Sequence, residues 1–240
     1  MRVKISVCMA MLLGLIFMAL PLCFAQPEDN VTVTVESEVE ILGESYVSLA
    51  MDELRLSDPR VQKADQYLTE QGFSPASETI KDNLFGIKQT YNASADGEEE
   101  EETYQLFLQE YSNPASNNTT AVGRMSIKSA DGTYATEYTF ILEAPKENVS
   151  QIEERYIAES EEGLEVVLAK SWWTCILGQL PQIGQECQVG VATCGQNATS
   201  IVGYIGCVAT NCGPSFSKHS ACCNCGCTKW CRWAFGCCHM

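Results

Sequence analysis

The placement of the cysteines constrains this chain more than any other feature of its sequence. Of the fourteen cysteines, Cys8 and Cys23 lie near the N-terminus, and the other twelve crowd between Cys175 and Cys238. A segment of about 70 residues buries too little apolar surface to offset its conformational entropy without cross-links. An even number of cysteines in such a segment predicts a disulfide framework. The cysteines that we expect in disulfides are Cys175, Cys187, Cys194, Cys207, Cys212, Cys222, Cys223, Cys225, Cys227, Cys231, Cys237 and Cys238.

An export signal accounts for the first two cysteines. Arg2 and Lys4 precede an apolar run that is shorter than the roughly 20 residues of a membrane-spanning helix. Ala25 is the small residue that such signals carry before the cut, which we place between Ala25 and Gln26. We therefore expect residues 1–25 to be removed and the protein to be secreted, where disulfides persist.

Several asparagines stand in the triplet Asn-x-Ser/Thr, the acceptor for N-glycosylation in secreted proteins. Polar loops rich in Asn, Ser and Thr also contain such triplets without being modified, so both interpretations stay open. The candidate glycosylation sites are Asn30, Asn92, Asn117, Asn118, Asn148 and Asn197.

The charge of the chain is divided as unevenly as its cysteines. Residues 26–169 carry 30 acidic and 9 basic side chains, whereas residues 170–240 carry four basic side chains and the single acid Glu186. Net charges of −21 and +3 favour binding between the two parts. The net charge of −16 for the whole chain argues against a nucleic-acid partner.

Residues 26–145 predict an acidic α+β leader domain with a small antiparallel sheet. Ser57, Asp58 and Pro59 together mark the start of a helix, and Gly72 marks its end. Residues 146–170 predict a charged, helical connector. Within the leader domain we expect helices at 44–56 and 59–71, strands or extended segments at 31–41, 79–91, 104–111, 121–128 and 134–142, and a solvated acidic loop at 98–102.

Residues 171–240 predict a small, disulfide-rich module that is mainly helical or irregular. Its almost uncharged middle carries apolar residues at helical spacing, and we expect them to form the core of the module rather than a membrane-seeking face. These residues are Ile201, Val202, Tyr204, Ile205 and Val208.

A cationic and aromatic cluster lies near the C-terminus. Lys229, Trp230, Arg232 and Trp233 suit an anionic lipid interface, so they are candidates for contact with a target-cell membrane or surface receptor. The alternative is that these aromatic side chains form the edge of a very small core.

The sequence offers no catalytic residues and implies no cofactor. The leader domain has no histidine and no cysteine, so neither a Ser-His-Asp nor a Cys-His arrangement can form within it. The crowded cysteines from Cys222 to Cys227, with His219 and His239 nearby, suit a thiolate metal cluster as an alternative to disulfides. An oxidising compartment favours disulfides, so we predict no metal, and a secreted metal-binding protein stays an alternative.

In its layout the chain resembles the halocin-type precursors, which are fusions of an immunity protein with a bacteriocin. The features in common are the cysteines from Cys175 to Cys212 with intervening Gly, Ala, Val and Ile segments, and a helix at Ser57-Asp58-Pro59-Arg60-Val61 followed by a β-rich stretch. The resemblance implies that the module is released as an antimicrobial peptide and that the N-terminal part binds and neutralises it. It does not extend to the dense block from Cys222 to Cys238.

Release of the module needs a cut in the chain. We expect this cut near Ala169, Lys170 or Ser171, where a charged segment precedes Trp172. After this cut the leader domain either is secreted or is retained at the cell surface. The competing class is a surface or adhesion protein whose module stays attached.

Overall fold

A computed structural model describes residues 33–76, 83–95, 98–130, 135–168, 172–187 and 191–225. All of them belong to one compact unit, Thr32–Met240. The expected signal peptide and its cleavage site, Ala25 and Gln26, lie outside the described residues.

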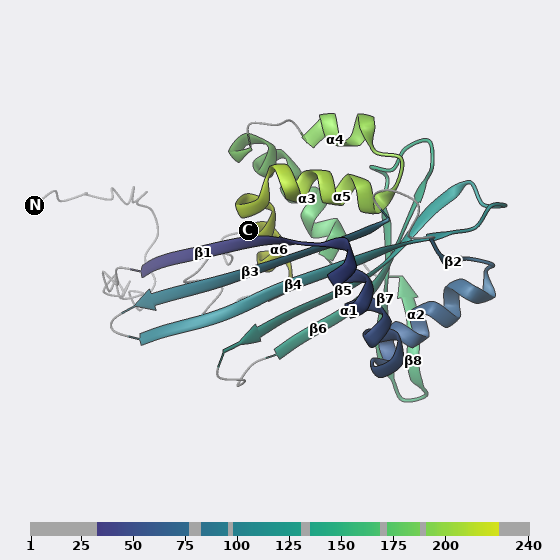
Figure 1. Ribbon diagram of the computed structural model, residues 1–240, viewed down its shortest axis with the longest axis horizontal. Helices are drawn as coiled ribbons and strands as arrows, with labels where there is room; N and C mark the ends of the chain where they lie inside the picture. Colours follow the sequence, from purple (N-terminus) through teal and green to yellow (C-terminus); the bar gives the residue numbers. More distant parts are fainter. Residues whose placement is uncertain are drawn as a thin grey trace, which may run out of the picture. The chain divides into compact units, whose positions relative to one another are not determined.

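Eight strands in the described part of the chain form one antiparallel sheet (Figure 1). This sheet is larger than the small one expected, because it takes in residues from both the leader domain and the connector. Its order is β1 (Val33–Leu42), β3 (Leu84–Ala95), β4 (Glu98–Ser112), β5 (Asn118–Ser129), β6 (Ala135–Pro145), β7 (Glu153–Ser160) and β8 (Gly163–Leu168), with the short β2 (Ser74–Pro75) paired to the end of β4.

Both faces of the sheet are apolar, as the central strand β4 illustrates. Successive side chains of a strand point to opposite faces. Tyr104, Leu106 and Leu108 belong to the apolar cluster on one face, whereas Phe107 and Tyr111 belong to the cluster on the other. A sheet with two apolar faces must be covered on both sides.

Two helices of the leader domain, both expected from the sequence, cover the first face. They are α1 (Glu44–Ser57) and α2 (Pro59–Glu70). The residue that caps α2 is Asp58, whose side chain accepts a hydrogen bond from the backbone N–H of Arg60. The hydroxyl of Ser57 instead donates to the carbonyl of Glu53 inside α1. Gly72, just after α2, has a φ of 80° and turns the chain back toward the sheet.

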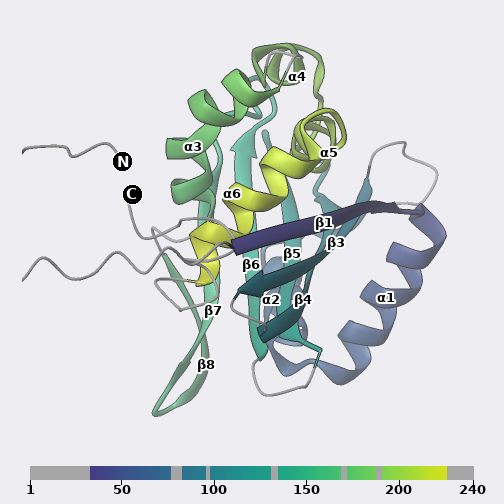
Figure 2. The same cartoon turned by 90° about the vertical axis from the view of Figure 1, so that its left-hand side faces the viewer.

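Four helices of the module cover the opposite face, which Figure 2 shows in a view where α1 lies on the far side of the sheet. They are α3 (Trp172–Glu186), α4 (Val191–Asn197), α5 (Ile201–Asn211) and α6 (Gly213–Cys225). The expectation of a mainly helical module is confirmed for these residues.

The connector forms strands, so the expectation of a helix there was wrong. It holds β7 and β8, which pair with each other, and β7 also pairs with β6. Tyr156 lies opposite Val167, and Ile157 lies opposite Val166. These aromatic and β-branched side chains favour a strand, and Gly163, with a φ of 119°, supplies the turn between the two strands.

The acidic run at residues 98–102 was expected to be a solvated loop, and this was also wrong. It is the first part of β4, where Glu98 lies opposite Ala95 and Glu102 opposite Tyr91. Glu101 is exposed and Glu102 is buried, which is the alternation of a strand. Pairing along the whole length of β3 overrides the poor strand propensity of glutamate.

Candidate functional site

One apolar cluster joins the module to the sheet. Side chains from β3, β4, β5 and β6 pack in it against those of α3, α5 and α6. The apolar residues expected to be buried are indeed buried, but against the sheet rather than in a core that belongs to the module alone. The largest contributors are Phe85, Ile87, Tyr91, Tyr104, Leu106, Leu108, Met125, Phe140 and Leu142 from the sheet, and Trp172, Trp173, Ile176, Ile201, Tyr204, Ile205, Val208 and Phe216 from the module.

Two adjacent tryptophans anchor the first helix of the module. Trp172 and Trp173 are 2% and 1% exposed, although they directly follow the expected cleavage region. The ring centroid of Trp172 lies 5.0 Å from that of Phe140 on β6. The indole N–H of Trp172 donates to Ser220 Oγ at 2.9 Å, and Ser220 Oγ lies 2.6 Å from the hydroxyl of Tyr104 on β4. The buried interface therefore contains a polar chain that joins both parts.

Two glycines leave room for aromatic rings, one between the helix layer and the sheet and one within the sheet. A Cβ atom on Gly206 of α5 would lie 3.1 Å from the ring of Phe85 on β3. A Cβ atom on Gly123 of β5 would lie 2.1 Å from the ring of Phe140, which is its cross-strand neighbour. The absent side chains leave room for aromatic rings in the shared cluster.

Two buried glutamates of the sheet reach the module. Glu110 of β4 accepts a hydrogen bond from the backbone N–H of Val202 at 3.2 Å and another from the hydroxyl of Thr119. Burial raises the pKa of Glu110 to about 8, against the opposing effect of hydrogen bonds from the backbone of Val202 and Ile201. Glu154 of β7 accepts a hydrogen bond from the backbone N–H of Trp173 at 2.6 Å.

Sequence reasoning missed both glutamates, although β4 carries a signal. Glu110 continues the series of Tyr104, Leu106 and Leu108, so an acid stands where the alternation calls for an apolar residue. Glu154 follows an exposed glutamate in a segment that we expected to be helical, and nothing there distinguished it.

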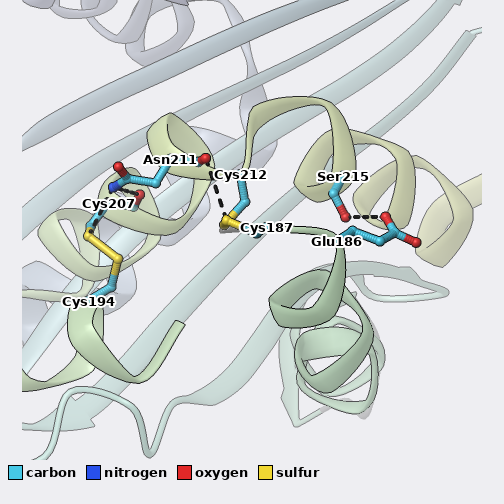
Figure 3. Close-up of a disulfide and its surroundings, with 7 residues drawn as sticks. All are labelled: Glu186, Cys187, Cys194, Cys207, Asn211, Cys212 and Ser215. Atoms are coloured by element: carbon cyan, nitrogen blue, oxygen red, sulfur yellow. Dashed lines mark hydrogen bonds between the residues drawn. A yellow bond between two sulfur atoms is a disulfide. The ribbon is translucent and has the colours of Figure 1, made fainter. Parts of the chain in front are cut away.

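Disulfides join the helices of the module to one another. Cys175 bonds Cys223. Cys187 bonds Cys212, and Cys194 bonds Cys207 (Figure 3). Cys222 is also disulfide-bonded. No disulfide in the described part of the chain ties the module to the sheet, and residues 26–174 contain no cysteine at all. The other cysteines expected in disulfides, Cys225, Cys227, Cys231, Cys237 and Cys238, lie outside the described side chains.

The only acid of the module bridges two of its helices. Glu186, at the end of α3, accepts a hydrogen bond from the hydroxyl of Ser215 at 2.6 Å and lies 3.7 Å from His219 Nε2 (Figure 3 shows the Glu186–Ser215 contact). The bond from Ser215 is the main reason that the pKa of Glu186 is lowered, and burial lowers the pKa of His219. Because the hydroxyl points at the carboxylate rather than at the imidazole, this is not the arrangement that activates a serine nucleophile.

Several of the expected sites lie outside the described residues. They are the cleavage region Ala169, Lys170 and Ser171, the cationic and aromatic cluster Lys229, Trp230, Arg232 and Trp233, and Asn30. The other candidate glycosylation sites, Asn92, Asn117, Asn118, Asn148 and Asn197, have exposed side chains, so each is accessible.

The described residues bring together no group of three or more His, Cys, Asp or Glu side chains that could hold a metal ion. No helix among them is both long and apolar enough to cross a membrane. The disulfides are consistent with an extracellular protein. Comparison of the chain with protein-family models, curated proteins and solved structures gave no match.

Proposed function

We propose that this protein is a secreted precursor of a disulfide-stabilised antimicrobial peptide, and that its N-terminal part, residues 26–170, binds and neutralises that peptide. The observation that carries the proposal is the burial of the module's apolar face on the sheet without any disulfide between them in the described residues. Such an arrangement inhibits a peptide by covering the surface through which it acts, yet leaves it separable.

The apolar face of α5 is the surface that would act on a target. Ile201, Ile205 and Val208 are fully or almost fully buried on the sheet. In the released module they would form an exposed apolar patch on a helix, which favours insertion into a lipid interface or binding to a receptor. The disulfides that link α3, α4, α5 and α6 would hold the helices together after release.

The position of the expected cut fits a neutralised complex. Residues 169–171 join the edge strand β8, whose last residue Leu168 is 71% exposed, to the buried Trp172. Cutting there breaks the chain without removing any of the contacts described above. The module would therefore stay on the sheet after cleavage, and activity would begin when it dissociates.

The test replaces residues 169–171 with the recognition site of a specific protease. The uncut protein, the cut complex and the oxidised module purified from it are compared for growth inhibition and for leakage of vesicles made of anionic phospholipid. We expect activity from the purified module alone, and loss of that activity when the N-terminal part is added back.

A purified module that is inactive in both assays would contradict the proposal. Free thiols with stoichiometric zinc in that module would support the metal-binding alternative, since a disulfide framework leaves no thiolate ligands. Secretion of intact protein that is never cut would support the adhesion alternative.

A further inference from the structure

Two helices of the module begin on carboxylates that belong to the sheet. The first turn of α3 meets Glu154 of β7 through the backbone N–H of Trp173. The first turn of α5 meets Glu110 of β4 through the backbone N–H of Val202. The first N–H groups of a helix have no partner within the helix, so a buried carboxyl oxygen that accepts their hydrogen bonds suits them well.

The module cannot supply these carboxylates itself. Neither α3 nor α5 has an acidic residue in its first turn. Its single acid, Glu186, lies at the opposite end of α3 and is engaged by Ser215. At α5 the side chain of Ser200 accepts from the N–H of Gly203, which leaves the N–H of Val202 to Glu110.

The two glutamates lie in one row across the sheet. Glu110 lies opposite Ala121, Ala121 opposite Leu142, and Leu142 opposite Glu154. The carboxylates are thus three strand spacings apart, roughly 14 Å. The row presents two acids separated by apolar side chains, and it fixes both the position and the direction of the helices that bind it.

We propose that Glu110 and Glu154 are the residues by which the N-terminal part recognises the module, each capping one helix of the module across the cut chain. This inference rests on the proposed function, since it concerns binding after cleavage. A peptide without two helix N-termini at this spacing would fail to make at least one of these buried hydrogen bonds, which is the kind of penalty that makes binding specific.

The experiment uses the full chain with the protease site at residues 169–171, cut and kept oxidised. The dissociation rate of the module is measured by chasing the complex with an excess of labelled module. We expect E110A and E154A each to accelerate dissociation about 10- to 100-fold, the usual effect of removing a buried hydrogen-bond partner of this strength. E101A and E153A, at exposed glutamates of the same strands, serve as matched controls and should stay within about twofold of the parent.

Dissociation of E110A and E154A at the rate of the controls would overturn the proposal. If an alanine variant fails to form the disulfides of the uncut parent, E110M and E154M take its place, since methionine keeps roughly the size of the side chain but cannot accept the N–H as glutamate does. These variants should also dissociate faster than the controls, and rates equal to those of the controls overturn the proposal. Growth inhibition by the purified module is scored separately, and its absence would overturn the proposed function while leaving the recognition result intact.

Discussion

At the scale of single residues, the surfaces that meet in this protein are defined more by their few polar groups than by their apolar ones. Ile201 and Val208 would pack on many apolar sheets, because hydrophobic contact is non-directional. Glu110 and Glu154 accept hydrogen bonds from particular N–H groups, so they are satisfied only when the helices are correctly placed. For the proposed binding we expect the free energy to come mainly from the apolar contacts, and the choice of partner from the hydrogen bonds to Glu110 and Glu154.

The raised pKa of Glu110 predicts that the stability of the protein depends on pH. The pKa is about 8 in the folded protein and 4.5 as the ordinary value. Between these values the folded protein holds a proton that the unfolded chain has lost, so stability falls as the pH rises from about 4.5 to about 8. Urea unfolding of the uncut protein at several pH values across this window measures the effect.

The matched variant for this prediction is E110Q, which keeps a neutral hydrogen-bonding side chain at all pH values. Its stability should equal that of the parent near the acidic end of the window and exceed it near the alkaline end. Equal pH profiles of the parent and E110Q would contradict the prediction, because other titrating groups contribute equally to both proteins.

At the scale of elements, the sequence predicted correctly those elements that are specified by residues close to one another in the chain. The helix α2 was predictable because Asp58, Pro59 and Gly72 act within one turn of the chain. The residues of α5 were correctly expected to be buried, since helical spacing identifies an apolar face. That spacing carries no information on what covers the face, so the sheet could not be identified as its partner.

The strands show the same division between local and long-range causes. Residues 98–102 and 153–168 are rich in glutamate, which has low strand propensity. They nevertheless form strands, because residues 98–102 pair with β3, β7 pairs with β6, and β7 and β8 pair with each other. Glu154 could not be found from the sequence for this reason, since its face depends on the register of β7. Glu110 was within reach, because an acid that interrupts an apolar alternation is itself a signal.

The ring of Phe140, which lies where a side chain at Gly123 would stand, gives a prediction with an internal comparison. Replacing Gly123 with alanine places a methyl group where the buried ring of Phe140 lies, and we expect a loss of about 1–3 kcal/mol in the free energy of unfolding. Replacing Gly178 with alanine in α3, where a Cβ atom meets nothing within 4 Å, should stabilise the helix by roughly 0.5–1 kcal/mol. Denaturant unfolding of both variants measures the two effects. A change in the free energy of unfolding that has the same direction in both variants would contradict this account of Gly123.

At the scale of the whole molecule, two different agents hold the helices of the module in place. The sheet covers their apolar face, and the disulfides link Cys175 to Cys223, Cys187 to Cys212 and Cys194 to Cys207. Dissociation of the module would remove the cover of the sheet but would leave the disulfides intact. The disulfides should therefore matter far more to the free module than to the uncut chain.

Reduction tests this difference directly. The chain-entropy model assigns about 3 kcal/mol to a disulfide that closes 13 residues and about 4 kcal/mol to one that closes 48. We expect the reduced module to lose most of its helical circular dichroism, and the reduced uncut chain to keep most of its own. A reduced module that stays as helical as the oxidised one would contradict this prediction, because its helices would then need neither the sheet nor the disulfides.

The shared apolar cluster has a consequence for the partner that stays behind. When the module leaves, the sheet loses the cover over Ile87, Leu106, Leu108 and Met125, while α1 and α2 still protect its other face. An exposed apolar sheet surface of that kind attracts a second module or another copy of itself. Under the proposed function each N-terminal part would neutralise one module, so the protection of a producing cell would be limited by the number of N-terminal parts that it retains.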